Sequence, residues 1–175
     1  MKELLNIDEI FMKEALREAR RARDLGEVPV GAVVVMNGQV VVRGCNSMLT
    51  SRDPSAHAEM VVIRKTALLT GNYRLNGATL YITLEPCLMC SGAIVLSRVD
   101  RVVYGAREPK TGAHESAFQV LSNPRNNHMP DVTGGILAEE CAAILSDFFR
   151  KRRAEKKARK RAEREAAADP AIPDP

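Results

Sequence analysis

The chain has 175 residues, a length typical of one domain with its own core. Hydrophobic residues make up 45%, which excludes disorder throughout, while 4% aromatic residues and no Trp leave few rings for a broad base-stacking platform. The net charge of +4 is unevenly placed: residues 150–165 hold 10 basic and 3 acidic side chains, whereas residues 1–149 hold 16 and 17. The basic character therefore belongs to the C-terminal tail.

The N-terminal sequence MKELLNIDEI is charged, and no apolar run exceeds five residues, as at 32–36. This pattern predicts neither a signal peptide nor a membrane span. Four cysteines in such a chain indicate a reducing compartment, where close spacing favours metal or redox chemistry over disulfides. We expect a cytoplasmic protein with no membrane partner.

An amphipathic helix is predicted first, with Asp8 as a candidate N-cap and Gly26 as a stop signal. Its apolar positions, at helical spacing, are Ile10, Phe11, Ala15, Leu16, Ala19 and Ala22. Two β-branched segments follow, at 28–36 and 39–43, on either side of Asn37-Gly38. This dipeptide is the one that a type I′ hairpin prefers, so the segments predict two antiparallel strands.

The middle of the chain alternates between strands and helices. Residues 44–56 are rich in turn formers and predict a loop, and 57–69 have a helical pattern closed by Gly71-Asn72. A short strand is predicted at 79–84, followed by a helix over 87–97 with Pro86 in its first turn.

After a strand at 101–106, residues 107–130 predict mostly loop, with a brief helical patch at 116–121. A fifth strand is predicted at 132–137, interrupted by Gly134-Gly135. The last helix carries an apolar stripe formed by Leu137, Cys141, Ile144, Leu145, Phe148 and Phe149.

From Arg150 the sequence has high helix propensity but no apolar face, which predicts an extension of the last helix into solvent. The Pro-rich end, 169–175, predicts a frayed terminus. The alternation of strands and helices predicts an α/β sandwich with about five strands.

Two motifs carry the chemistry: His57-Ala58-Glu59 and, 26 residues later, Pro86-Cys87-Leu88-Met89-Cys90. Thiolates at i and i+3 of a helix start share one face, and the helix N-terminus favours their negative charge. With the imidazole of His57 they make three Zn²⁺ ligands, which leaves the fourth tetrahedral position for water, as in catalytic sites. Glu59 is placed to take a proton from that water and deliver it to a substrate.

A structural alternative is that His57 caps a helix while Cys87 and Cys90 are buried thiols or part of a closed zinc site. The agreement of both motifs in order and context favours the catalytic interpretation. H-x-E with P-C-x-x-C is the established signature of the zinc nucleobase deaminases, so this step is a match to a known pattern.

The chain resembles the bacterial tRNA-specific adenosine deaminases over residues 8 to 153, in the stretches DPSAHAEM, ATLYITLEPCLMCSGAIVLSR, RVVYGAREPKTGA and GILAEECAAILSDFFR. The resemblance implies a three-layer α/β/α cytidine deaminase-like fold with a mixed sheet, one zinc ion per subunit, and a homodimer. It also implies conversion of the wobble adenosine of a tRNA anticodon to inosine. We expect a deaminase domain over 1–153 and a basic tail over 154–175.

The resemblance further implies five substrate contacts. Asn46 matches an asparagine that hydrogen-bonds the adenine, and its alternative is an ordinary loop residue. Lys110 and Asn127 match positions that touch the anticodon loop. The alternative interpretations are an ordinary exposed lysine and an ordinary turn asparagine. Glu108 stands where better-known members have Asp, so its longer side chain shifts the expected RNA contact. Phe149 matches an aromatic near the flipped base, although its apolar stripe equally fits core packing.

Three hypotheses remain at this point: a tRNA adenosine deaminase, a deaminase of a free base or nucleoside such as cytosine or guanine, and a noncatalytic RNA-binding module with structural zinc. The last requires a fourth protein ligand, for which Cys45 and His114 are candidates. The tail is either a solvated charged helix or a surface that attracts tRNA phosphates, and we favour the RNA role.

Overall fold

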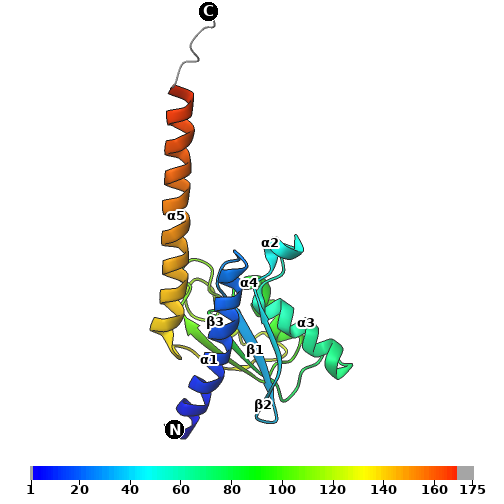
Figure 1. Cartoon of the computed structure of the whole chain (residues 1–175). Coiled ribbons are helices and arrows are strands. Elements are labelled where there is room, and N and C mark those ends of the chain that lie inside the picture. Colours follow the sequence, from blue (N-terminus) through cyan, green and yellow to red (C-terminus); the bar gives the residue numbers. More distant parts are fainter. Residues whose placement is uncertain (1, 169–175) are drawn as a thin grey trace, which may run out of the picture.

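The computed structural model describes residues 2–168, with side chains from 7 to 167 (Figure 1). The predicted frayed terminus at 169–175 lies outside the described residues. One five-stranded sheet forms the centre, in the order β2-β1-β3-β4-β5. Its strands are β1 (Gly31–Met36), β2 (Gln39–Cys45), β3 (Thr79–Leu84), β4 (Arg101–Ala106) and β5 (Asp131–Thr133). β1 is antiparallel to both neighbours, whereas β3, β4 and β5 are parallel, so the mixed sheet is confirmed.

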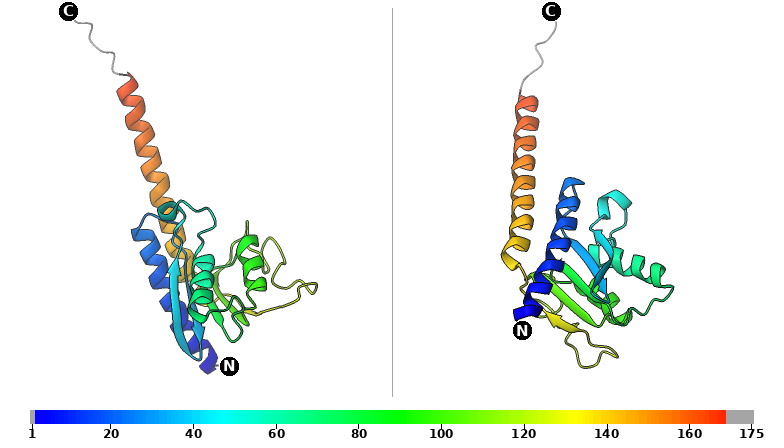
Figure 2. Two further views of the ribbon diagram at one scale, coloured as in Figure 1. Left: turned by 90° about the vertical axis from the view of Figure 1, so that its right-hand side faces the viewer. Right: turned by 60° about the horizontal axis from the view of Figure 1, so that its bottom comes forward.

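Helices cover both faces of the sheet, which confirms the three-layer arrangement (Figures 1 and 2). On one face lie α1 (Lys2–Asp24) and α5 (Ala138–Ala168), and on the other α3 (Ala58–Thr70) and α4 (Leu88–Leu96). A short helix, α2 (Met48–Ser51), interrupts the loop predicted at 44–56. No helix of the described part has both the length and the apolar character needed to cross a membrane.

The core divides into two clusters because successive residues of a strand point to opposite faces. On β1, Ala32 and Val34 join the cluster under α3 and α4, whereas Val33 and Val35 join the one under α1 and α5. Runs of mostly apolar residues mark strands that are buried on both faces. This pattern explains why the bounds predicted for β3 and β4 agree with the structure.

The turn and the helix stop signals predicted from Asn and Gly residues are confirmed by their backbone conformations. Asn37 and Gly38 both have positive φ, as the hairpin turn requires, and Gly71 caps α3 in the left-handed conformation. Gly26, also at positive φ, follows α1 as the predicted stop. The basic segment extends α5 as one uninterrupted helix to Ala168.

Asp8 does not cap the first helix, because α1 already begins at Lys2. Its carboxylate is buried and accepts hydrogen bonds from both terminal nitrogens of Arg101, each at 2.7 Å, and from the Tyr81 hydroxyl at 2.8 Å. The residue therefore fastens α1 to β3 and β4. Pro86 likewise lies outside its helix, since Cys87 is the N-cap of α4.

Two further elements differ from prediction for tertiary reasons. The patch at 116–121 forms turns, because the backbone N–H groups of Ala117 and Phe118 donate to the Gly112 carbonyl. β5 ends at Thr133, and the next residue, Gly134, lies so close to Tyr104 that an added Cβ would be 2.4 Å from its ring. The chain therefore leaves the sheet there and turns toward α5.

Candidate functional site

The candidate site lies at the edge of the sheet where β2, β3 and β4 all end, since these strands run in the same direction. Asn46, Glu85 and Glu108 follow the three strands within two residues. Helices α3 and α4 start at this edge, with His57 and Cys87 as their N-caps. The fold therefore brings two helix N-termini and three loops together at one place. Helix N-termini favour negative charge.

His57, Cys87 and Cys90 form a group of potential metal ligands whose donor atoms all lie within 4.8 Å of one another. Nδ1 of His57 is 3.7 Å from Sγ of Cys87 and 3.6 Å from Sγ of Cys90. A tetrahedral Zn²⁺ with Zn–S near 2.3 Å and Zn–N near 2.0 Å separates its ligand atoms by about 3.5 Å. The donor types and their spacing therefore fit zinc.

The two cysteines differ in ionisation. A hydrogen bond from Cys90, together with His57, lowers the pKa of Cys87 to about 4, although burial opposes this shift. The same contact with Cys87, together with burial, raises the pKa of Cys90. One sulfur is therefore a thiolate at neutral pH, which is the form that binds a metal.

Glu59 is the second residue of α3 and is only 4% exposed. Burial raises the pKa of its carboxyl to about 7, against the lowering influence of its own backbone N–H and of His57. A carboxyl with this pKa exchanges a proton readily near neutral pH, which suits a general acid–base. It lines the same pocket as His57 and Cys87.

The pocket has a volume of about 140 Å³. Sites for drug-sized ligands are typically about 300–1,000 Å³, so this pocket suits one planar base and not a whole nucleotide. Both apolar and polar side chains line it: Val28, Val30, Asn46, Met48, His57, Glu59, Leu84, Glu85, Cys87, Glu108 and Thr111.

Asn46 is buried in the pocket wall and joins three segments of the chain. Its Oδ1 accepts a hydrogen bond from the Ala58 backbone N–H at 2.8 Å, and its Nδ2 donates to the Val28 carbonyl at 3.1 Å. It thereby fixes the N-terminus of α3, which carries Glu59. A primary amide retains one further donor hydrogen and one acceptor lone pair for a ligand.

The other contacts implied by resemblance fall in different places. Glu108 lines the pocket, and its backbone N–H donates to Glu85. Phe149 is 43% exposed and lines a neighbouring groove of about 620 Å³ that shares Met48 with the pocket. Lys110 and Asn127 are exposed and are not part of the pocket lining.

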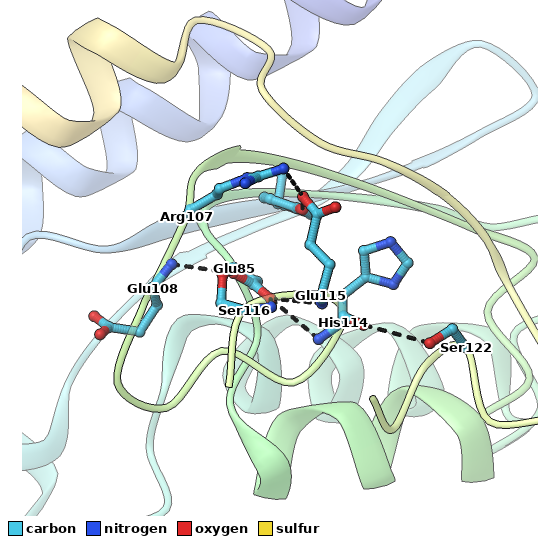
Figure 3. A network of polar contacts seen from close by, with 8 residues as sticks. Glu85, Arg107, Glu108, His114, Glu115, Ser116 and Ser122 are labelled. Carbon is cyan, nitrogen blue, oxygen red and sulfur yellow. Dashed lines mark hydrogen bonds and ion pairs between the residues drawn. The ribbon is translucent and has the colours of Figure 1, made fainter. Parts of the chain in front are cut away.

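Glu85 is a positioning residue that the sequence did not single out (Figure 3). Its carboxylate accepts hydrogen bonds from the backbone N–H groups of Glu108, His114, Glu115 and Ser116 at 3.0–3.1 Å, and from the Ser116 hydroxyl. Burial alone would raise the pKa of Glu85, but these bonds lower it to about 2. An ionisable residue at the end of a buried strand, directly before Pro86-Cys87, was the available signal.

Glu27 plays a similar part for the segment that contains α2. Its fully buried carboxylate accepts hydrogen bonds from the backbone N–H groups of Leu49 and Thr50 and from the Thr50 hydroxyl, at 2.7–3.2 Å. These bonds hold α2, whose Met48 lines the pocket.

A fourth protein ligand is not found among the described residues, where only His57, Cys87 and Cys90 gather as a potential metal group. Cys45 is buried elsewhere, at the end of β2. The His114 ring packs edge-on against Tyr104, with centroids 5.9 Å apart. This geometry favours an open, catalytic zinc site over a closed structural one.

Comparison with known proteins agrees with this site. Residues 5–106 match the family model of the cytidine and deoxycytidylate deaminase zinc-binding region. The chain is 51% identical over 151 residues to a tRNA-specific adenosine deaminase of Bacillus subtilis, covering 86% of this chain and 94% of the relative.

Solved structures show the same similarity. A structure from a study of A-to-I editing by tRNA:A34 deaminases at the wobble position superposes with a TM-score of 0.75 and 48% identity, covering 77% of this chain and 98% of that one. A guanine deaminase from Bacillus subtilis reaches 0.56 at 33% identity, covering 79% and 91%. The open His-Cys-Cys group, the buried Glu59 and the similarity to these relatives agree: the chain belongs to the tRNA-specific adenosine deaminases, within the cytidine and deoxycytidylate deaminase family.

Proposed function

We propose that the chain is a zinc-dependent hydrolase that converts adenosine to inosine at the wobble position of tRNA anticodons. The observation that carries the proposal is the three-ligand metal group with the buried carboxyl of Glu59 in the adjoining pocket. The 51% identity to a tRNA-specific adenosine deaminase supports the choice of adenine and of tRNA.

His57, Cys87 and Cys90 would hold the ion. Zn²⁺ supplies a Lewis acid that lowers the pKa of a water molecule. Glu59 accepts a proton from the attacking water, passes it to N1 of the adenine ring and assists departure of the amine from C6. Water adds and ammonia leaves, so no organic cofactor is consumed.

The small pocket requires that the target base leaves its neighbours and enters alone, as in the single-stranded loop of an anticodon. Asn46 has hydrogen-bonding capacity left to recognise that base, and Glu108 stands at the pocket wall. We assign Lys110, Asn127 and Phe149 to contacts with the rest of the anticodon loop, since they lie outside the pocket.

The same proposal includes a homodimer in the cytoplasm. Helix α4 presents three apolar side chains to solvent, Leu88 at 47%, Met89 at 38% and Leu96 at 71% exposure. Apolar side chains gathered on one helix favour a protein interface. The metal group requires reduced thiols, and all four cysteines are free, which fits a reducing compartment.

Deamination of a free base is the second candidate, supported by the similarity to a guanine deaminase. The two functions differ in the substrate that must be bound outside the pocket. Incubation of the purified protein with anticodon stem-loop RNA and, separately, with free adenine, guanine and cytosine distinguishes them. We expect inosine in the RNA and no ammonia from the free bases.

The catalytic assignment is tested with Glu59→Gln, which keeps the shape of the side chain but removes its proton transfer. We expect turnover on anticodon RNA to fall at least about a thousandfold, because general acid–base catalysis is lost. Zinc content, measured by atomic emission, stays near one per chain. Chelation of wild type abolishes turnover, and added Zn²⁺ restores it.

Glu139→Gln is the matched control, since Glu139 is exposed in the first turn of α5. It should turn over like wild type. Undiminished turnover by Glu59→Gln would show that another group moves the proton, and loss of zinc from it would make Glu59 a structural residue.

A further inference from the structure

Beyond the body of the protein, α5 continues into solvent as a long helix (Figures 1 and 2). Every residue from 150 to 167 is exposed, and the only apolar side chains in this stretch are alanines. The first turn of this stretch stays beside the end of α1, where Arg152 donates to the Gly26 carbonyl at 3.5 Å, and the rest extends away from the domain. Its surface chemistry is set by charge.

The charges are sorted by helix face. Six basic residues follow the spacing i, i+3, i+4, i+7, i+8 and i+11, which places them on one side of a helix. We call this set the basic stripe, and it consists of Arg153, Lys156, Lys157, Lys160, Arg161 and Arg164. Together with Glu165, they line one shallow surface of the helix. Lys151, Arg159 and the acidic Glu155 lie on the other side.

Ion pairing leaves the stripe largely unneutralised. Arg161 donates to Glu165 at 2.7 Å, whereas the Arg159–Glu163 pair, at 3.4 Å, involves an arginine off the stripe. Among residues whose side chains the structure describes, the other five members of the stripe have no ion-pair partner. The stripe therefore has its charge available for an external anion.

The stripe is also continuous with the site. Arg153 follows Phe149 by one helical turn, and Phe149 lines the groove that shares Met48 with the catalytic pocket. From Arg153 to Arg164 the helix rises about 16 Å, at 1.5 Å per residue. Six basic side chains spread over this length can reach several phosphates of a nucleic-acid strand.

We propose that the basic stripe binds the phosphate backbone of the double-helical stem next to the loop whose base enters the pocket. This inference rests on the proposed function, since it takes an RNA hairpin as the substrate. An anionic membrane is disfavoured as the partner, because a membrane-bound helix needs bulky apolar side chains opposite its charges and this segment has only alanines.

The test compares two double variants that remove the same charge from different faces. Lys157→Gln/Lys160→Gln changes the stripe, and Lys151→Gln/Arg159→Gln changes the other side. Affinity for an anticodon stem-loop RNA is measured as a function of salt concentration, and circular dichroism checks that both variants keep their helix.

We expect the stripe variant to bind roughly fivefold more weakly near 0.1 M salt, and the slope of log K against log salt to shrink by about two. The off-stripe variant should bind like wild type. The loss should diminish on an RNA whose stem is shortened to a few base pairs, because fewer phosphates then reach the stripe.

Equal losses of RNA affinity in the two variants would overturn the proposal, because net charge alone would then explain them. Unchanged affinity in both variants would overturn it as well. Binding to phosphatidylserine-containing vesicles that the stripe variant abolishes would assign the surface to a membrane instead. If wild type forms no inosine yet the stripe variant still weakens RNA binding, the proposed function fails while the stripe inference stands.

Discussion

Among the residues whose side chains the structure describes, four carboxylates are almost fully buried, and their surroundings give them opposite properties. Asp8, Glu27 and Glu85 each accept several hydrogen bonds, which outweigh burial and lower their pKa values. For Glu59, burial dominates and raises the pKa to about 7. Three buried acids therefore serve structure as permanent anions, and the fourth is free to exchange a proton.

Glu85→Gln should destabilise the protein, because a neutral amide replaces the carboxylate that accepts four backbone N–H groups. A pKa lowered from 4.5 to about 2 corresponds to about 3 kcal/mol. Since the folded-state pKa is the lower one, this stability is complete above pH 4.5 and is lost as the pH falls toward 2.

Urea unfolding at pH 7 and at pH 3 measures this effect. We expect Glu85→Gln to lose about 2–3 kcal/mol at pH 7 and roughly half as much at pH 3, because pH 3 lies between the folded and unfolded pKa values. Glu163→Gln, on the exposed part of α5, serves as the control and should change stability little at either pH. An equal loss for Glu85→Gln at both pH values would contradict the electrostatic explanation.

At the scale of elements, α1 packs tightly against the start of β1. A Cβ on Gly31 would lie 2.1 Å from the Ala15 carbonyl oxygen and 2.4 Å from the Ala19 backbone nitrogen. Only glycine permits this contact, because the opposing atoms are backbone and cannot rotate away. The contact lies directly after Val28 and Val30 of the pocket lining.

Gly31→Ala should therefore cost at least about 3 kcal/mol in the free energy of unfolding, since α1 must shift away from the sheet. Gly38→Ala is the matched control: its new methyl meets nothing within 4 Å, and only the φ of 73° opposes it. That strain costs about 1 kcal/mol. Thermal and urea unfolding compare the two variants, and similar losses would show that α1 accommodates the methyl group.

At the scale of the whole molecule, helix α4 faces the core on one side and solvent on the other. Helix α4 carries Cys90, a proposed ligand, on its buried side and exposes Leu88, Met89 and Leu96 on the other. If a second copy covers this face, the helix that supports the metal group is held from both sides. The dimer would then stabilise the site as well as extend the RNA-binding surface.

Leu96→Asp should shift the protein from dimer to monomer, because a charge would be buried at the interface without a partner. Light scattering coupled to size-exclusion chromatography measures the mass. Leu25→Asp introduces the same charge at another exposed leucine, beyond the end of α1, and should leave the dimer intact. If Leu96→Asp remains a dimer, the interface lies elsewhere. If the wild type is a monomer, the proposed dimer does not exist.

The sequence by itself determined those features in which neighbouring residues decide the outcome. The buried runs of β3 and β4, the Asn37-Gly38 turn, the Gly71 cap and the continuation of α5 all follow from local pattern and backbone preference. The zinc motif is similarly local, since its ligands lie at two helix starts that the pattern could place.

Only the tertiary structure decided the use of each polar group, because a hydrogen-bond partner can lie anywhere along the chain. Asp8 looked like a cap but pairs with Arg101, 93 residues away. Glu85 gave no strong local signal, yet it organises the turns where a helical patch was expected. Burial and hydrogen bonding together set the pKa values of these acids, and both are properties of the folded chain. The raised pKa that lets Glu59 exchange a proton therefore depends on the tertiary structure.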